Sequence, residues 1–255
     1  MSVYSAFARY YDELTANIDY KKRAEYFHTI ISKFKTTKEN ILLDLACGTG
    51  SLSEQFSRLG YDVVGIDNSD EMLSSAINKK FESGLPIQYL CQDMRKIDMF
   101  GTIDVTVCAL DSINHLAHLS DVAETFAGVS FFSEQGGLFI FDVNTPYKHR
   151  SVLANNTFTY ETDNVYCVWE NTLDAKTDEV GMNLQFFERR SDGLYSRSSE
   201  HFSEKAYSEE DIERLLSENG FELLAKYGDD TFLPPTETSQ RIVYAARVVR
   251  SGQKL

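Results

Sequence analysis

The chain contains 255 residues, of which 42% are hydrophobic and 25% are charged, and its formal net charge is −14 at pH 7. This composition is typical of a globular protein with one large α/β domain, or with one domain that carries a sizeable insertion. So acidic a chain repels phosphodiester backbones, and no apolar run approaches the roughly 18 residues of a membrane span, so we expect neither general nucleic-acid binding nor a membrane partner.

The four cysteines, Cys47, Cys91, Cys108 and Cys167, lie far apart and form no Cys-x-x-Cys pair. This spacing favours neither a zinc site nor a disulfide framework. The first residues also lack the apolar segment of a signal peptide. We therefore expect a cytoplasmic protein without a metal site.

The first expected element is an N-terminal helical cap over residues 1–36. Aromatic and aliphatic side chains recur at helical spacing over residues 4–36, and a break near Asn17 to Tyr20 divides them into two pieces.

Residues 41–50 read ILLDLACGTG, an apolar run that ends in small residues. This pattern is typical of a buried parallel strand whose chain turns sharply into a helix beside a ligand. Gly48 and Gly50 remove the side chains that would keep a nucleotide away from the backbone, and the amides of the next helix would face that ligand. A Gly-x-Gly turn alone is a weak signal, because such turns are common without a ligand.

Two further apolar runs end in acidic residues. YDVVGIDNS contains Asp67, 17 residues after Gly50, where a strand-end acid is expected to meet ribose hydroxyls, and PIQYLCQDM leads to Asp93. Taken singly, each acid is more often a helix cap or a turn residue. Together they indicate a ligand site at the carboxyl ends of an open α/β sheet.

The glycine turn does not match the common nucleotide motifs. A nicotinamide-binding turn needs a third Gly or Ala, and the two possible frames place Ser53 or Ser51 there. The lysine of a phosphate-binding loop is also missing after Gly50. A carboxylate at Asp44 would repel a pyrophosphate, but it suits a ligand with an ammonium or sulfonium charge.

The next part of the chain predicts a strand at residues 103–109, a helix and another strand. We expect Ser120 to cap the helix, which would run to Phe132 and be terminated by Gly136 and Gly137. The sequence LFIFDV then forms a fifth strand.

The last hundred residues change character. Alternating runs over residues 152–205 predict an antiparallel meander of three to five strands. Ser208 followed by Asp211 predicts a capping box that opens a helix to Asn219, with Gly220 after it. FELLAKYG and RIVYAARVV predict the two last strands.

These residues resemble the class I S-adenosylmethionine-dependent methyltransferases, and the likeness is strong over residues 36–145. In that family an acid and a small-x-Gly-x-Gly turn end the first strand, an acid of the second strand holds both ribose hydroxyls, and an Asp-Met pair borders the adenine. The resemblance implies S-adenosylmethionine as the cofactor. It implies cofactor contacts for Asp44, Ala46, Cys47, Gly48, Gly50, Asp67, Asn68, Met72, Asp93, Met94 and Leu110.

The same resemblance implies a Rossmann-like α/β fold. Its seven-stranded sheet has an antiparallel last strand and helices on both faces. Residues 37–150 and 206–255 would form the S-adenosylmethionine-binding domain. Residues 151–205 would form a β-meander lid over the substrate site, which an insertion after the fifth strand places above the strand ends.

Three segments, YDEL, QDMR and SINHL, are more similar to small-molecule N-methyltransferases, such as aminosugar N,N-dimethyltransferases and, more distantly, glycine N-methyltransferase. The Asn/Asp-Pro-Pro-Tyr/Phe tetrapeptide of enzymes that methylate amino groups in nucleic acids is absent. The resemblance implies a small-molecule acceptor, first of all an amine, with a hydroxyl or carboxylate as lesser options. It also implies that His115 is a general base and that Tyr11 and Tyr20 lie over the cofactor.

Three residues are expected near the acceptor. Asp111 and Asn114 belong to the loop after the fourth strand, and the fork of Arg241 would hold an anionic group of the substrate. The alternatives are packing roles for His115, Met72 and the two tyrosines. A nucleoside-binding sensor or partner module without catalysis, an NAD-dependent oxidoreductase and a homodimer also remain open.

Overall fold

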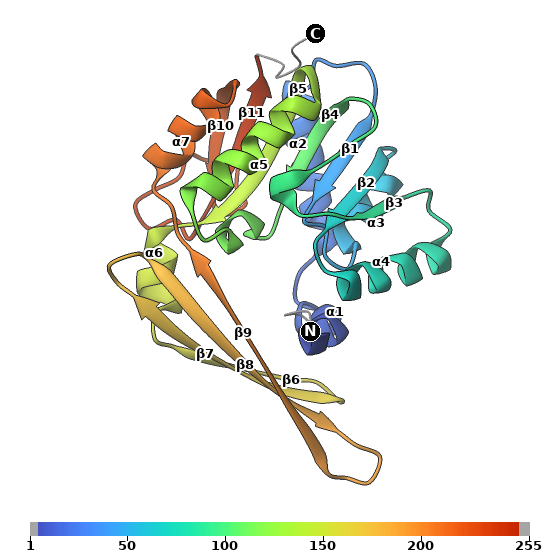
Figure 1. Cartoon of the computed structure of the whole chain (residues 1–255), viewed down its shortest axis with the longest axis vertical. Coiled ribbons are helices and arrows are strands. Elements are labelled where there is room, and N and C mark those ends of the chain that lie inside the picture. The colour runs from blue at the N-terminus through green and yellow to red at the C-terminus, as the bar shows by residue number, and fades with distance from the viewer. Residues whose placement is uncertain (1–4, 250–255) are drawn as a thin grey trace.

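The computed structural model describes residues 5–249 and contains two separate sheets (Figure 1). The larger sheet has seven strands in the order β10-β11-β5-β4-β1-β2-β3. β11 runs antiparallel to both of its neighbours, and the pairs of β1 with β2 and β4, of β2 with β3 and of β4 with β5 are parallel. The strands are β1 Ile41–Leu45, β2 Asp62–Asp67, β3 Gln88–Cys91, β4 Ile103–Cys108, β5 Ser133–Asn144, β10 Phe221–Gly228 and β11 Arg241–Val248. The predicted seven-stranded methyltransferase sheet with its antiparallel last strand is confirmed.

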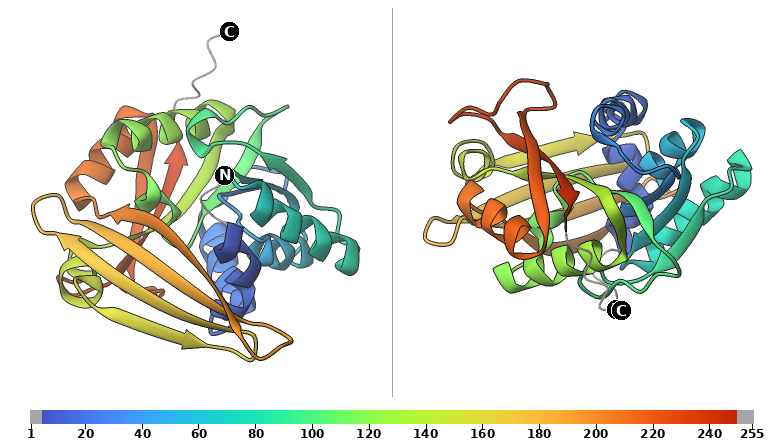
Figure 2. Two further views of the ribbon diagram at one scale, coloured as in Figure 1. Left: turned by 60° about the horizontal axis from the view of Figure 1, so that its bottom comes forward. Right: turned by 90° about the horizontal axis from the view of Figure 1, so that it is seen from above.

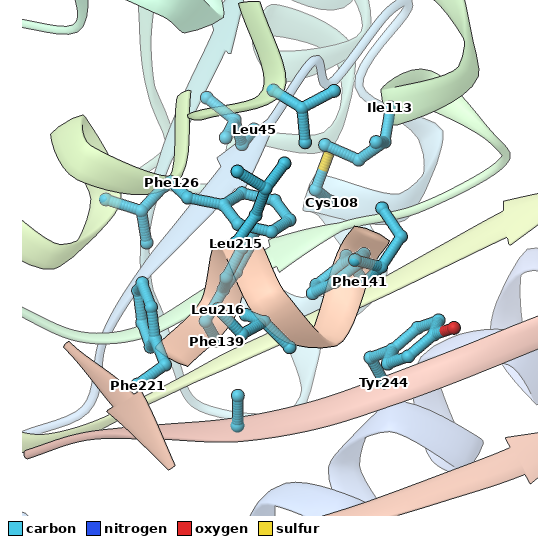
Figure 3. Packing of buried hydrophobic residues seen from close by; sticks show 14 of the residues in the cluster. Leu45, Cys108, Ile113, Phe126, Phe139, Phe141, Leu215, Leu216, Phe221 and Tyr244 are labelled. Carbon is cyan, nitrogen blue, oxygen red and sulfur yellow. The ribbon is translucent and has the colours of Figure 1, made fainter. Parts of the chain in front are cut away.

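Helices cover both faces of this sheet, because successive residues of the central strands point to opposite sides. On one face, Leu42 and Ile140 pack with α2 and α3; on the other, Leu43 and Phe141 pack with α5 and α7. The core on the face covered by α5 and α7 contains stacked aromatic rings, and the ring centroids of Phe141 and Tyr244 lie 5.1 Å apart (Figure 3). The helices are α1 Ser5–Leu14, α2 Tyr20–Phe34, α3 Ser51–Arg58, α4 Asp70–Ser83, α5 Leu119–Phe132, α6 Pro146–Lys148 and α7 Glu209–Glu218, with short turns η1 Met94–Lys96, η2 Ser112–His115 and η3 His149–Leu153.

The predicted helix boundaries are correct where a side chain caps the helix. Ser208 precedes α7, and its hydroxyl accepts a hydrogen bond from the Asp211 amide, as the capping box requires. The break between the first two helices also lies where expected, with α1 ending at Leu14 and α2 beginning at Tyr20.

The predicted last residue of α5, Phe132, is correct, but the predicted cap and the predicted terminating glycines are wrong. The helix begins at Leu119 after His118, which makes no side-chain capping bond, so Ser120 lies inside the helix. The helix stops at Phe132, because Ser133 already pairs with Ile103 of β4, and Gly136 and Gly137 therefore belong to β5. Sheet pairing, rather than glycine, ends this helix.

Residues 157–205 form the second sheet, with antiparallel strands β6 Thr157–Glu161, β7 Val165–Asp174, β8 Glu179–Arg189 and β9 Tyr195–Lys205. The predicted meander is thus confirmed as four strands. This sheet lies beyond the carboxyl ends of the parallel strands, with α1 against it (Figure 2). Its core includes Phe186 and Cys167, and Tyr10 of α1 stacks on the Phe186 ring at 6.3 Å, so α1 and the second sheet share one core.

Candidate active site

A cavity of about 820 Å³ lies at the carboxyl ends of β1, β2 and β4, between the seven-stranded sheet, α1 and the second sheet. Its volume is within the range of small-molecule sites, roughly 300–1,000 Å³. It therefore lies where a ligand is expected to bind an open α/β sheet. Most predicted site residues line it: Tyr11, Tyr20, Asp44, Ala46, Cys47, Gly48, Asp67, Asn68, Met72, Asp93, Met94, Leu110, Asp111, His115 and Arg241.

Gly50 does not line the cavity, although its turn does. Its φ angle of +74° is left-handed, and a Cβ atom there would lie 2.9 Å from the Tyr89 ring, so only glycine fits both demands. Gly48 has φ +55°, and a Cβ atom there would meet nothing within 4 Å. Gly50 therefore shapes the turn from behind, and Gly48 leaves open space beside the backbone.

Asp44 is a nearly completely buried carboxylate at the end of β1. Its Oδ2 atom accepts a hydrogen bond of 2.5 Å from the Ser53 hydroxyl. Burial raises the pKa of Asp44 to about 7, and the Ser53 hydrogen bond opposes this shift. A cation placed beside it would favour the charged form, so the group is suited to a positively charged ligand.

Asp67 is held by backbone amides on both sides. Its Oδ2 accepts from the Gly48 amide at 2.8 Å, and its Oδ1 accepts from the Ser69 amide at 2.9 Å. These bonds fix the carboxylate between the glycine turn and the start of α4. Each carboxylate oxygen can accept a further bond, so Asp67 can still accept from ligand hydroxyls.

Asp93 lies at the predicted place, but its carboxylate has a partner that the sequence analysis missed. Arg95 donates to it from Nε at 2.9 Å and from Nη2 at 2.5 Å. The side-chain hydrogen bonds from Arg95 hold the pKa of the Asp93 carboxyl below the usual value of an aspartate. The Asp-x-Arg spacing in QDMR is the signal that could have revealed this pair.

The loop after β4 has an unusual backbone. Leu110 and Asp111 have φ angles of +59° and +57°, which are rare for residues other than glycine. The buried carboxylate of Asp142 holds this turn, since it accepts from the Leu110 amide at 3.0 Å and from the Asp111 amide at 2.7 Å. The sequence analysis missed Asp142, whose signal is a carboxylate inside the apolar run LFIFDV.

The structure corrects the expected role of Arg241. Its guanidinium donates to Asp142 Oδ1 at 2.7 Å and to Asp111 Oδ1 at 2.6 Å. Burial alone would raise the pKa of Asp111, but Arg241, with Lys148 and His115, holds it below its usual value. The fork of Arg241 is therefore already neutralised by two carboxylates of the chain, and it is not a free cation for an anionic substrate group.

Asn114 also differs from the expectation. Its side chain is completely buried and does not line the cavity. Its Nδ2 atom donates to the carbonyl oxygens of Asn144 and Lys205, and its Oδ1 atom accepts from the Asn144 amide at 2.8 Å. Asn114 thus joins η2 to β5 and to the end of β9 and does not face an acceptor.

His115 does line the cavity, and its side chain is 31% exposed. Its Nε2 atom lies 3.8 Å from Glu204 Oε1, and its ring lies 5.5 Å from that of Phe202. Glu204 lines the cavity too, but the sequence analysis missed it, because it belongs to the alternating strand β9 without any local motif.

The two tyrosines are placed as expected along the cavity. Burial, and then the neighbouring Tyr20, raises the pKa of Tyr11 well above its usual value, and the Tyr20 hydroxyl donates to Thr15 at 3.1 Å. Asp12 fastens α1 from the other side, since it accepts from the Thr49 hydroxyl at 2.7 Å and pairs with Lys79 at 2.5 Å.

Comparison with known proteins identifies the family. The model described as "Methyltransferase domain" matches residues 42–137. The chain is 32% identical over 246 residues to YqeM of Bacillus subtilis (strain 168), which is named as a candidate methyltransferase, and the match covers 96% of this chain and 97% of that protein. The crystal structure of an S-adenosylmethionine-dependent methyltransferase from Clostridium acetobutylicum ATCC 824 has 35% identity and a TM-score of 0.85, covering 97% and 99% of the two chains. The chain belongs to the S-adenosylmethionine-dependent methyltransferases.

The fold of this methyltransferase is shared more widely. The structure of S-adenosylmethionine-bound CalS10, an amino pentose methyltransferase from Micromonospora echinaspora, has a TM-score of 0.72 at 19% identity and covers 97% of each chain. The cofactor is S-adenosylmethionine, and the polar groups that line the cavity fit it. The carboxylates of Asp93, Asp67 and Asp44 line the cavity together with the open backbone at Gly48, and carboxylates can accept hydrogen bonds from ribose hydroxyls and attract a cationic tail.

Residues 5–249 contain no helix that is both long and apolar enough to cross a membrane. They also contain no group of three or more His, Cys, Asp or Glu side chains arranged to hold a metal ion.

Proposed function

We propose that this methyltransferase transfers the methyl group of S-adenosylmethionine to a small-molecule amine. The observation that carries the proposal is the chemistry of the cavity beside the loop after β4. There the carboxylate of Glu204 lies 3.8 Å from His115, and Asp111, the partner of Arg241, lines the same cavity. Carboxylates attract an ammonium group, and an imidazole is suited to remove its proton.

Anionic acceptors find little support in the same cavity. Both arginines that line it are already paired, Arg95 with Asp93 and Arg241 with Asp111 and Asp142. A second carboxylate or a phosphate would therefore meet Asp111 and Glu204 without a free guanidinium among the described lining residues. The amine is favoured by charge complementarity.

The walls of the acceptor region favour a compact molecule. Tyr160, Trp169 and Phe202 of the second sheet line the cavity, and the Phe202 ring lies 5.5 Å from that of His115. Aromatic faces pack well on the apolar side of a ring or chain and attract cations. The net charge of −14 further disfavours nucleic acids. CalS10, which shares the fold, is named as an amino pentose methyltransferase, an acceptor class with these properties.

The cofactor contacts that we propose follow from the polar and apolar groups that line the cavity. Asp44 would face the cationic tail, Asp67 the ribose hydroxyls, and Asp93 with Met94 the adenine edge, with Met72 against the adenine face. Ala46, Cys47, Gly48, Asn68 and Leu110 would shape the rest of the contact surface, and Tyr11 and Tyr20 would cover it.

The chemistry asks little of the protein beyond positioning. S-adenosylmethionine supplies a methyl group that is already activated on a sulfonium. The chain holds the acceptor nitrogen in line with it at roughly 3–3.5 Å and excludes water. We propose that His115 accepts a proton from the bound ammonium group. The nitrogen must lose this proton before its lone pair can attack the methyl group.

The same proposal assigns tasks to the parts of the chain. Residues 5–36 form a cap, residues 37–150 and 206–249 bind the cofactor, and residues 151–205 form the lid that sets acceptor specificity. Residues 1–4 and 250–255 of the predicted domains lie outside the described residues. A cytoplasmic location agrees with the four cysteines, all of which are free.

A methyl-transfer screen tests the acceptor class. The protein is incubated with S-adenosylmethionine labelled in the methyl group and with sets of molecules that share a skeleton and differ only in an amine, hydroxyl or carboxylate. We expect label in amine products only. Label in the hydroxyl or carboxylate members, or in transfer RNA offered alone, would show that the acceptor assignment is wrong.

A further inference from the structure

Glu204 is the meeting point of three elements around the acceptor region. It lies near the end of β9 and is 4% exposed, yet it lines the cavity. Its Oε1 atom faces His115 Nε2 of η2 at 3.8 Å, and its Oε2 atom faces His149 Nε2 of η3 at 3.7 Å. Oε2 also accepts a hydrogen bond of 2.9 Å from Asn144 Nδ2 of β5.

The buried ring of His149 lies behind this carboxylate. His149 is completely buried, and its Nδ1 atom lies 2.8 Å from the backbone carbonyl oxygen of Asp178. A carbonyl oxygen can only accept, so Nδ1 carries a hydrogen. The Nε2 atom has no hydrogen-bond partner and faces Glu204. The protonation state of His149 Nε2 therefore decides whether Glu204 faces an N–H group or a lone pair.

A neutral His149 would place the Nε2 lone pair opposite a carboxylate inside the protein. Two acceptors facing each other in a low-dielectric site repel, whereas one proton between them converts the contact into an ion pair. The charges nearby have both signs, because Lys148 and Arg241 lie in the same network as Asp111 and Asp142. Lys148 of α6 and Asp111 both hydrogen-bond to the side chain of Asn144, the residue that donates to Glu204. His115, at 3.8 Å, is the remaining titratable neighbour.

We propose that His149 is a buried imidazolium that keeps Glu204 ionised, and that Glu204 is the carboxylate that binds the ammonium group of the acceptor. This rests on the proposed amine-directed function. Glu204 contacts the acceptor directly, and His149 is a positioning residue that acts through it. The pair explains how a carboxylate that is 4% exposed remains charged in the cavity wall.

The first test needs neither a variant nor an acceptor. In protein with ¹⁵N-labelled histidine, saturated with S-adenosylhomocysteine, we expect both ring nitrogens of His149 to be protonated at about pH 7, whereas an isolated imidazole is mostly neutral there. His149→Gln assigns the signal, and Glu204→Gln should return the ring to one proton. An unprotonated Nε2 in the wild type at this pH would overturn the proposal, whatever the acceptor proves to be.

The second test measures cation selectivity with two probes of equal shape. In the same complex, benzylamine should bind at least tenfold more tightly than benzyl alcohol. Glu204→Gln should remove this preference, while Glu170→Gln, which removes an exposed carboxylate of β7, should keep it. A preference that survives Glu204→Gln means that the ammonium binds elsewhere and contradicts the proposal.

The pH dependence separates the task of His149 from simple packing. Without the imidazolium, burial alone acts on Glu204 and favours its neutral form. In His149→Gln the preference for benzylamine should therefore appear only at a higher pH than in the wild type, and His201→Gln, which replaces an exposed histidine of β9, should leave the midpoint in place. An unshifted midpoint in His149→Gln would refute the positioning role. Failure of every amine in the methyl-transfer screen, with these binding results intact, would instead refute only the proposed function.

Discussion

The carboxylates in and beside this cavity differ sharply in their burial and in their charge partners, although they lie close together. Asp44 is neutralised in part by burial, Asp93 is paired with an arginine, and Asp142 has both oxygens occupied by amides and guanidinium groups. The sequence shows all three as acidic residues at the ends of apolar runs. Their environments, rather than their identity, decide which of them can meet a ligand cation.

Cofactor affinity should depend on pH through Asp44. Its pKa of about 7 lies above that of an exposed aspartate, and a bound ammonium would lower it. We therefore expect the affinity for S-adenosylhomocysteine to rise with pH up to about 7 and then to level off, by calorimetric titration between about pH 5.5 and 7.5. Asp44→Asn should bind more weakly and lose this pH dependence. An equally steep pH dependence in Asp44→Asn would contradict the assignment.

The same raised pKa has a consequence for stability. The unfolded chain releases the Asp44 proton near its ordinary value of 3.8, whereas the folded chain keeps it up to about pH 7. The ligand-free protein therefore loses stability through Asp44 as the pH rises across this window. Asp44→Asn should reduce this loss, as measured by urea unfolding at about pH 5 and pH 8.

His115 should matter for turnover and not for cofactor binding. If it removes the acceptor proton, His115→Ala should lower kcat roughly 10²-fold or more with the amine found in the screen. The dissociation constant for S-adenosylhomocysteine should stay within about twofold. An equal loss in both quantities would make His115 a packing residue, and unchanged turnover would leave the enzyme to act by positioning alone.

At the scale of elements, polar contacts hold α1 over the cavity from two sides: Arg9 pairs with the second sheet, and Asp12 binds the seven-stranded domain. Asp12 bonds to Thr49 in the glycine turn and to Lys79 of α4, and Phe7, Tyr11 and Leu14 of the same helix line the cavity. We expect Asp12→Ala to loosen this helix and to speed the dissociation of S-adenosylhomocysteine, measured by stopped-flow mixing. Glu25→Ala, an exposed change on α2, is the matched control. Equal dissociation rates in the two variants would show that α1 does not cover the cofactor.

Elements with local signals could be predicted, and elements set by tertiary contacts could not. The Ser208 cap and the alternation of β6–β9 are local, so the helix α7 and the second sheet were found. The predicted end of α5 at Phe132 is correct, but its cause is the pairing of Ser133 with Ile103, which no local pattern reveals. The short helical turns over residues 146–153, which bring His149 behind Glu204, were missed for the same reason.

The site residues also divide into those that local signals predict and those that they do not. Residues at the ends of consecutive parallel strands could be found, because their topology brings them together at one edge. Asp142, Glu204 and His149 could not, because no local motif marks them: Asp142 stands inside an apolar strand, Glu204 on an alternating strand, and His149 in a short turn. Arg241 and Asp111 were both predicted, but the ion pairs of Arg241 with Asp111 and with Asp142 were not.

At the scale of the whole molecule, the cofactor site depends on the ends of β1, β2, β3 and β4 and on α1 and the second sheet, which meet over one cavity. The shared core of α1 and the second sheet, with Tyr10 stacked on Phe186, encloses the side of the cavity that faces away from the main sheet. This enclosure is what in-line methyl transfer requires, since water must be kept from the reacting groups.

The central claim is that this cavity binds the cofactor through the acid at the end of β2, and calorimetric titration of S-adenosylhomocysteine tests it most directly. Asp67→Ala removes at least one charge-assisted hydrogen bond to ribose, worth about 1.5–3 kcal/mol, so we expect a roughly ten- to hundred-fold loss of affinity. Asp62→Ala, at the exposed start of the same strand, should bind like the wild type, and NADH should not compete. Tight binding of NADH, or an Asp67→Ala variant with unchanged affinity for S-adenosylhomocysteine, would contradict the account.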